Sequence, residues 1–362
     1  PNGQFGTRLQ GGDDAASERY ICTQLSKLTR LIFPEADDAV LTYLEDDGTP
    51  VEPMFYVPII PMQLVNGGKG IGTGFSTDIL NYNPLTIIDD IKQRLLLGDD
   101  GEEKVQPQPK QLTPYYNGFK GTITSLNDQD NKYLIKGVYE ILSDKQVRVT
   151  ELPIGTWTDD YKKYIEDLID FKPLAQTQDK DKKDKDKKAS KKSKSDQPQI
   201  KDYIDMSTDT VVDFTITFAP GVIAGLKDAV VEHGTCTALE KLLKLYTTRS
   251  STNMHVFDEN EKLIKCEKVD DVIKHFMKVR EAYYIKRKKY QVDALKKELC
   301  VLSNKARFIS EVLDDTIDLR KKKSAEVSEI MKTQKYDMVD EDEQYKYLVR
   351  LPMDSVTEEN VE

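Results

Sequence analysis

The last third of the chain constrains the fold most, because it lacks the two residue types that interrupt helices. No glycine occurs after Gly234, and the only proline beyond Pro220 is Pro352. Apolar residues recur at three- and four-residue spacing over 269–313, with a slip near Tyr290. The set is Val272, Phe276, Val279, Tyr283, Leu295, Leu299, Leu302, Ala306, Ile309 and Leu313. This pattern predicts one helix of about 45 residues, about 65 Å long, that packs on a partner helix or forms an intramolecular hairpin.

Residues 51 to about 265 are typical of mixed strand and helix. Alternating apolar and polar residues predict strands over 132–142 and 210–218. The segment 180–194 consists of Lys, Asp and Ser with one Ala, so it cannot form a core. We expect a solvated insertion at about 177–198. Such a segment can contact DNA non-specifically or serve in nuclear import, but a loop without a dedicated role explains it better.

The overall charge does not favour a nucleic-acid partner. The net charge is −10, whereas duplex binding depends on neutralising phosphates. Acidic residues collect in patches such as 99–103 and 340–343, so a local basic groove stays open as a possibility. The four cysteines are widely separated and the three histidines lack ligand spacing, which argues against a metal site and fits reduced thiols. The sequence contains no stretch long enough to span a membrane, and we expect no membrane partner.

An Arg-Tyr pair, Arg19-Tyr20, follows a glycine-bearing stretch near the start of the chain. We expect a helix over 14–32, capped by Asp13 or Asp14, with Tyr20 at the edge of its apolar face beside cations. A phenol has a reference pKa of about 10 and needs nearby positive charge to become a nucleophile. A guanidinium can also grip a phosphodiester. Taken alone, an Arg-Tyr dipeptide on an amphipathic helix is more often a pair of surface residues without a chemical role.

Three further segments and one arginine are candidates for function. Ile71 stands among the glycines of 67–74, which fits a structural turn with a buried Ile, or a wedge that enters between base pairs. Trp157 is the only tryptophan, and a lone Trp is most often in a core. The hydroxyl-rich run 244–253 carries two cations and suits phosphate contacts. Arg8, in the loop before Tyr20, is another candidate to face DNA.

Long motifs in the chain resemble those of type IIA DNA topoisomerases, in particular the eukaryotic topoisomerase II. They are PNGQFGTRLQGGDDAASERYICTQLSKLTRLIFP (1–34), VEPMFYVPIIPMQLVNGGKGIGTGFS (51–76), ELPIGTWT (151–158) and NKARFI (304–309). The resemblance covers nearly the whole sequence, and the motifs occur in the family's order. The chain fits the eukaryotic branch of the family better than the bacterial branch, because of its Lys-rich insertion and the amino-acid sequence of the Ile71 loop.

The resemblance implies a role for each candidate residue. Tyr20 would attack a DNA phosphodiester and become joined to the 5′ end, and Arg19 would stabilise the transition state. Ile71 would occupy the intercalating position. The remaining DNA-contact candidates are Trp157, Arg8, Asn66, Lys69, Lys244, Thr247, Arg249 and Asn253. No metal ligand is predicted within the chain.

The expected fold class is α+β and multidomain. A partial winged-helix unit with the tyrosine would span 1–50, a mixed α/β tower domain 51–265, and a coiled-coil arm with part of a dimerisation gate 266–362. The resemblance implies a nuclear, homodimeric, ATP-dependent enzyme that acts on double-stranded DNA, with Mg²⁺ and ATP bound outside this chain. We therefore expect a piece of a longer enzyme, inactive alone.

Two other function classes compete with this interpretation. An architectural module would bend DNA and dimerise without its own catalysis. A coiled-coil interaction protein would lack salt-dependent DNA binding altogether.

Overall fold

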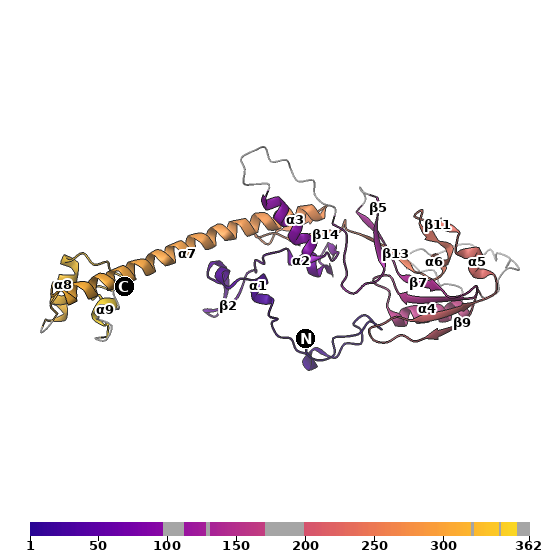
Figure 1. Cartoon of the computed structure of the whole chain (residues 1–362), viewed down its shortest axis with the longest axis horizontal. Helices are drawn as coiled ribbons and strands as arrows, with labels where there is room; N and C mark the ends of the chain where they lie inside the picture. Colours follow the sequence, from indigo (N-terminus) through magenta and orange to yellow (C-terminus); the bar gives the residue numbers. More distant parts are fainter. Residues whose placement is uncertain (97–111, 128–130, 171–198, 320–321, 340–341, 353–362) are drawn as a thin grey trace. The chain divides into compact units, whose positions relative to one another are not determined.

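The computed structural model describes residues 1–96, 112–127, 131–170, 199–319, 322–339 and 342–352. Its contacts form two compact units. The first comprises 1–32 and 58–278, and the second comprises 33–57 and 279–362. The expected mixture of strands and helices is present, and so is the long helix, as α7 (Val269–Leu313) (Figure 1). The Lys-rich insertion lies outside the described residues.

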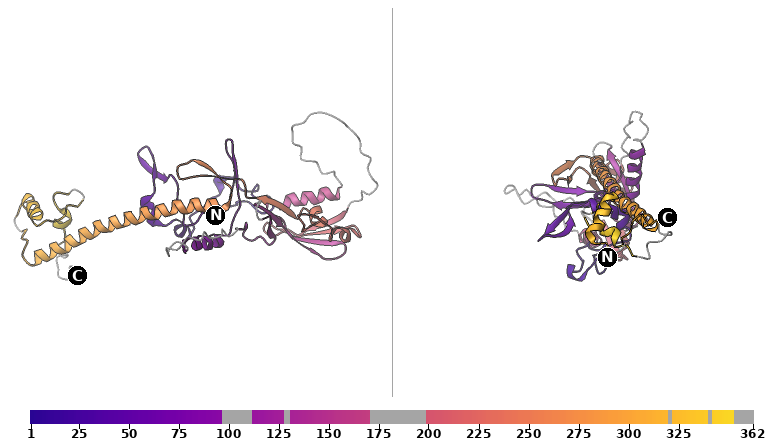
Figure 2. Two further views of the ribbon diagram at one scale, coloured as in Figure 1. Left: turned by 90° about the horizontal axis from the view of Figure 1, so that it is seen from above. Right: turned by 90° about the vertical axis from the view of Figure 1, so that its left-hand side faces the viewer.

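The main sheet of the first unit is antiparallel, with the strand order β7-β8-β10-β9. Along β10, Phe214, Ile216 and Phe218 are buried while the threonines between them are half-buried, as expected for a strand with one face on a core. Helix α4 lies along this face (Figure 2). The elements are β7 (Val138–Ile141), β8 (Gln146–Glu151), α4 (Thr158–Ile169), β9 (Ile200–Asp205), β10 (Phe214–Phe218), α5 (Val222–Leu226) and α6 (Ala238–Leu242).

The strand predicted over 132–142 is divided at Gly137 between two sheets. Its first half, β6 (Lys132–Lys136), is the central strand of the order β13-β6-β5, with β5 (Thr122–Asn127) and β13 (Tyr246–Ser250). Its second half is β7 of the main sheet. A Cβ at Gly137 would overlap the Glu151 carbonyl oxygen. The chain therefore changes sheets at the one residue without a side chain, a close backbone approach that periodicity does not reveal.

Short hairpins and helices complete the first unit. A second core includes Leu64, Ile87, Tyr133, Met254 and Val272. The elements are η1 (Glu18–Tyr20), α1 (Thr29–Ile32), α2 (Met62–Asn66), β3 (Gly68–Ile71), β4 (Ser76–Ile79), α3 (Pro84–Leu96), β11 (Val230–Glu232), β12 (Cys236–Thr237), β14 (Met254–Phe257) and β15 (Leu263–Cys266). Strands β3 and β4 pair with each other, as do β14 and β15.

The second unit joins residues 33–57 to the remainder of α7. Arg280 of α7 is buried and donates to Asp37 at 2.6 Å and to the Val57 carbonyl at 3.0 Å. Arg287 pairs with the other oxygen of Asp37 at 3.2 Å. The smaller elements are η2 (Glu35–Val40), β1 (Tyr43–Asp46), β2 (Thr49–Pro53), α8 (Ser324–Thr333) and α9 (Lys346–Val349). A small core that includes Phe308, Met331 and Leu348 packs α8 and α9 on the end of α7.

The helix predicted over 14–32 is wrong. The structure has only the short 3₁₀ turn η1 and the four-residue α1 in this range. Leu25 is 81% exposed and Leu28 is 61% exposed, so the apolar face of the predicted helix has no core to cover it. Most helical stability in proteins comes from packing such a face. The amphipathic pattern is present, but the burial that would stabilise a helix is not.

Candidate nucleic-acid interface

Arg19 and Tyr20 lie together at the surface. Tyr20 is 73% exposed, and the guanidinium carbon of Arg19 lies 5.5 Å from the centroid of its ring. The Tyr20 N–H donates to the Ser17 carbonyl at 2.9 Å, which closes the turn η1. An exposed phenol is accessible to a bulky substrate, and the adjacent guanidinium can hold the non-bridging oxygens of a phosphodiester.

The backbone of Tyr20 is held by the first residues of the chain. Asn2 and Cys22 exchange two backbone hydrogen bonds of 2.7 and 2.9 Å. The next residue after Asn2, Gly3, has a φ of 106°, and a Cβ at Gly3 would lie 3.0 Å from the Tyr20 carbonyl oxygen. Glycine is needed here because an L side chain disfavours this φ and would crowd the tyrosine. The glycine-bearing stretch therefore supports the tyrosine directly.

The segment that we name the 7–14 turn folds on itself. The Gly11 N–H donates to the Thr7 carbonyl at 2.9 Å, and the Thr7 N–H donates to the Asp14 carboxylate at 3.0 Å. The Thr7 hydroxyl also donates to Asp14. These hydrogen bonds lower the pKa of Asp14 below its ordinary value. The predicted helix-capping role of Asp14 is wrong, because its carboxylate closes this turn instead.

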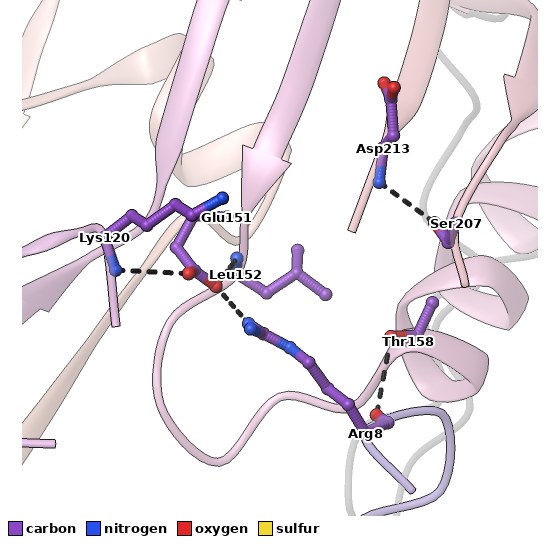
Figure 3. A network of polar contacts seen from close by, with 7 residues as sticks. All are labelled: Arg8, Lys120, Glu151, Leu152, Thr158, Ser207 and Asp213. Carbon is purple, nitrogen blue, oxygen red and sulfur yellow. Dashed lines mark hydrogen bonds and ion pairs between the residues drawn. The ribbon is translucent and has the colours of Figure 1, made fainter. Parts of the chain in front are cut away.

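The Arg8 side chain forms an ion pair with Glu151 at the end of β8 (Figure 3). Glu151 is 1% exposed and also accepts the backbone N–H groups of Lys120 at 3.2 Å and Leu152 at 3.1 Å. The Arg8 carbonyl accepts from the Thr158 hydroxyl at 3.4 Å. The guanidinium that was a candidate for facing DNA therefore holds a buried carboxylate of its own chain.

Glu151 was not singled out from the sequence, although a signal for it was present. Val147 and Val149 are fully buried and alternate with exposed or half-buried residues along β8, and Glu151 continues that buried register. A carboxylate at a buried position requires hydrogen bonds and a cation. A charged residue in phase with buried valines is thus a recognisable sign of an internal ion pair.

Trp157 precedes α4 and is 38% exposed. Gly11 of the 7–14 turn lies against its indole, since a Cβ at Gly11 would overlap the ring. The φ of Gly11 is 66°, which also favours glycine. One face of the only tryptophan is therefore covered by this turn. The interpretation of Trp157 as a core residue is wrong, because the side chain is partly exposed, and its contact with DNA stays a prediction.

Ile71 stands at the end of β3 and is 94% exposed. Below it, the Gly72 N–H donates to the Phe75 carbonyl at 2.9 Å, and the Phe75 ring lies where a Gly72 side chain would be. The interpretation with a buried Ile is wrong, because the apolar side chain is presented to solvent. Lys69 is exposed on the same strand, opposite Asp78. Asn66 ends α2 and its carbonyl accepts from Asn81 at 2.6 Å.

The run 244–253 reaches the β3–β4 hairpin through two side chains. Arg249 approaches Asp78 at 3.6 Å, and Asn253 donates to the Ser76 hydroxyl at 2.9 Å. The structure therefore brings these two predicted residues together with the hairpin of Ile71. Lys244 instead lies 3.8 Å from the centroid of the Tyr164 ring. Thr247 is half-buried in β13.

No group of three or more His, Cys, Asp or Glu side chains suited to a metal ion occurs in the described ranges. Among those same residues, no helix combines the length and apolar character that crossing a bilayer requires.

Comparison with known proteins places the chain among topoisomerases. The family model for the A-type subunit of DNA gyrase/topoisomerase IV matches residues 1–362. The chain is 40% identical to DNA topoisomerase 2 of Bombyx mori over 92% of its own length and 19% of that protein. It is 36% identical to DNA topoisomerase 2 of Penicillium chrysogenum over 100% of its own length and 22% of that protein. A Dictyostelium discoideum relative, 35% identical over 100% of this chain and 25% of its own length, is named DNA topoisomerase 2, mitochondrial.

A solved structure has the same fold. The crystal structure of the Plasmodium falciparum topoisomerase II DNA-binding, cleavage and re-ligation domain matches with a TM-score of 0.74 and 34% identity. The match covers 100% of this chain and 47% of that one. The chain spans about a fifth of the length of the first curated relatives that it matches.

Proposed function

The chain belongs to the family of the A-type subunit of DNA gyrase/topoisomerase IV, and from this premise we propose that it is the DNA-cleaving and rejoining part of an enzyme like eukaryotic topoisomerase 2. The observation that carries the proposal is the exposed Tyr20 with the Arg19 guanidinium 5.5 Å from its ring. The whole enzyme makes a transient double-strand break, passes a second duplex through it and reseals it. Homodimerisation places one Tyr20 at each strand.

The chemistry assigned to Tyr20 is a reversible phosphoryl transfer. The phenol oxygen attacks the phosphorus of a DNA phosphodiester and its proton passes to solvent. The bond from phosphorus to the 3′ oxygen breaks, that oxygen takes up a proton, and the 5′ phosphate stays joined to Tyr20. Arg19 holds the non-bridging oxygens, where charge is greatest in the transition state. One phosphodiester bond is exchanged for another, so the reverse reaction can restore the strand without an external energy source.

Mg²⁺ and ATP belong to the proposed whole enzyme. Under this proposal, both are bound by parts of the enzyme outside this chain. The 362 residues alone bind and bend DNA weakly and do not complete strand passage.

The DNA-binding surface proposed for the chain is centred on the β3–β4 hairpin. Ile71 enters between base pairs and Lys69 contacts the backbone, with Asn66 beside them. Arg249 and Asn253, which contact the hairpin, and Thr247 line the approach to it. The side chains of Arg8, Trp157 and Lys244 contact Glu151, Gly11 and Tyr164 and not the hairpin, so we do not include them in the surface centred on it. The nucleus is the proposed compartment, and a fluorescent fusion that localises to mitochondria would refute it.

Covalent capture on DNA tests the assignment of Tyr20. In the full-length enzyme, Tyr20→Phe should abolish the 5′-phosphotyrosyl adduct while leaving duplex binding unchanged, because the phenol oxygen alone is removed. The substitution Tyr43→Phe, at a partly exposed tyrosine of β1, is the matched control and should retain the adduct. Adducts are measured by protein-linked radioactive DNA after denaturation.

The outcome separates the competing functions. An adduct that persists in Tyr20→Phe would refute this nucleophile. Salt-dependent bending without any adduct in the wild-type enzyme would support the architectural alternative, and the absence of salt-dependent binding would refute both.

A further inference from the structure

The 7–14 turn contacts the main sheet and α4. The phosphoryl transfer proposed for Tyr20 does not by itself require these contacts. The Arg8 N–H donates to the Asp209 carbonyl at 3.1 Å, and the Asp159 N–H donates to the Leu9 carbonyl at 3.0 Å. The Gln10 amide donates to the Asp159 carboxylate at 3.0 Å. The turn is thus joined by backbone and side chain to α4 and to the loop between β9 and β10, both far away in the sequence.

Glu151 is the buried end of this attachment. The side chain is 2% exposed, and it receives the Arg8 guanidinium together with two backbone N–H groups (Figure 3). A buried carboxylate that loses its cation is strongly unfavourable, whereas the partly exposed Arg8 can be hydrated when it is released. The buried charge therefore favours the docked position of the turn.

The docked turn is linked to the nucleophile by a short path of backbone contacts. A Cβ at Gly6 would lie 2.5 Å from the Gly12 Cα, so the backbone at Gly6 is in close contact with the backbone at Gly12. The Ala16 N–H donates to the Gln4 carbonyl at 3.0 Å, and the Asn2–Cys22 pair follows. Gly3 then abuts the Tyr20 carbonyl. Displacement of the 7–14 turn therefore displaces the peptide of Tyr20.

We propose that Arg8 and Glu151 are positioning residues for the phosphoryl transfer. Their ion pair fixes the 7–14 turn on β8 and α4, and the turn places Tyr20 relative to the scissile phosphate. Neither side chain touches DNA. The catalytic half of this inference rests on the function proposed above, whereas the docking of the turn does not.

Trp157 reports the docking without DNA or catalysis, because it is the only tryptophan and Gly11 covers its indole. In this chain, Arg8→Gln should shift the Trp157 emission to longer wavelength and increase its quenching by acrylamide. Arg94→Gln is the matched control, since Arg94 is also a partly buried arginine paired with carboxylates, those of Asp90 and Asp270. An unchanged Trp157 spectrum in Arg8→Gln would overturn the docking.

Kinetics of adduct formation test the positioning role in the full-length enzyme. Arg8→Gln and Glu151→Gln should each slow the adduct about 10- to 100-fold at saturating DNA, since small misplacements of reacting groups have effects of this size. The Kd for duplex DNA should stay at the wild-type value. The double variant should be no slower than the slower single one, because both changes remove the same pair. Arg8→Lys should restore part of the rate.

Each result decides the proposal. A wild-type rate in Arg8→Gln, or a slower rate explained by a weaker Kd, would overturn it, and the second result would make Arg8 a DNA contact. If Glu151→Gln fails to fold, as judged by its melting temperature, the partly exposed Arg8→Gln decides. A wild-type enzyme without any adduct would refute the proposed function and the positioning role together, while the Trp157 spectrum would still show whether the turn is docked.

Discussion

At the scale of single residues, the environment of each polar group explains its role better than its type does. Asp14 was expected to cap a helix, yet it accepts two hydrogen bonds from Thr7. Arg8 was a candidate to face DNA, and in the structure its guanidinium pairs with Glu151. In both cases a partner within the chain takes the side chain: Thr7 for Asp14 and Glu151 for Arg8. The requirement is stronger for Glu151, because a buried carboxylate without hydrogen bonds or a cation is costly.

The lowered pKa of Asp14 predicts a pH dependence of the 7–14 turn. A carboxyl group whose folded pKa is depressed contributes stability above its unfolded pKa, about 3.9, and loses it as the pH falls through the folded value. Between pH 7 and 5 the Trp157 emission should be constant. Below about pH 4 it should shift to longer wavelength as Asp14 takes up a proton.

Asp14→Asn is the control for this titration. The variant should show the shifted emission at pH 7 already and little further change attributable to this group on acidification. An acid transition of the same size in Asp14→Asn would assign the titration to another carboxyl group.

At the scale of elements, the β3–β4 hairpin shows how an exposed apolar side chain is supported. The Phe75 ring packs under Gly72 and lies 5.9 Å from the ring centroid of His255 and 6.3 Å from that of Phe257. The Asp78 N–H donates to the Asn253 carbonyl at 2.7 Å. Strand β14 and the residue before it thus brace the hairpin from one side, so that Ile71 projects from a supported base.

Loss of this brace should weaken DNA bending even though Ile71 is unchanged. Phe75→Ala removes the ring beneath Gly72, and we expect bending to fall toward the level of Ile71→Ala. Thr73→Ala, at an exposed position of the same hairpin, should bend DNA as the wild type does. Bending is measured by fluorescence energy transfer between the ends of a short duplex, and wild-type bending by Phe75→Ala would refute the brace.

A second element-scale prediction concerns the attachment of residues 33–57 to α7. Asp37→Asn leaves Arg280 buried without its carboxylate, which should destabilise the second unit by about 3 kcal/mol. Glu311→Gln, which breaks the more exposed pair with Arg307, should cost less than about 1 kcal/mol. Denaturant unfolding of the chain measures both variants, and equal losses would contradict the importance assigned to burial.

At the scale of the whole molecule, charge and function point in different directions. The chain has 63 acidic and 53 basic residues, yet the proposed partner is a polyanion. Local placement resolves this difference, because the potential near a surface depends on the nearest charges at physiological salt. Lys69 lies on the hairpin that carries Ile71, and Arg249 contacts that hairpin through Asp78. Carboxylates elsewhere, such as those of Asp37, Asp213 and Glu240, pair with cations of the chain.

Salt dependence provides the test at this scale. The affinity of the chain for duplex DNA should fall as salt rises, and Arg249→Gln should reduce the slope of log K against log salt by about 1. Lys241→Gln, at an exposed lysine paired with Glu232, should leave the slope unchanged. Equal slopes for wild type and Arg249→Gln would remove Arg249 from the DNA surface.

The amino-acid sequence alone determined the elements whose stability is local. Helix α7 begins and ends where the periodicity does, at Val269 and Leu313, because 45 residues without glycine or proline favour a helix throughout. Three leucines of this helix are exposed: Leu295, Leu299 and Leu302. No described helix covers them, so the partner helix of the coiled coil stays a prediction. The motifs likewise identified the family, whereas the exposure of Ile71 came from the structure.

Only the tertiary structure decided what depends on distant partners. Arg8 and Glu151 are 143 residues apart in the sequence, so no local pattern joins them. The helix expected over 14–32 failed for the same reason, since an amphipathic face is stabilised by the surface that covers it. A glycine at position 137 divided one predicted strand between two sheets. Periodicity reports which face a side chain would occupy, but burial and pairing depend on what the fold brings to that face.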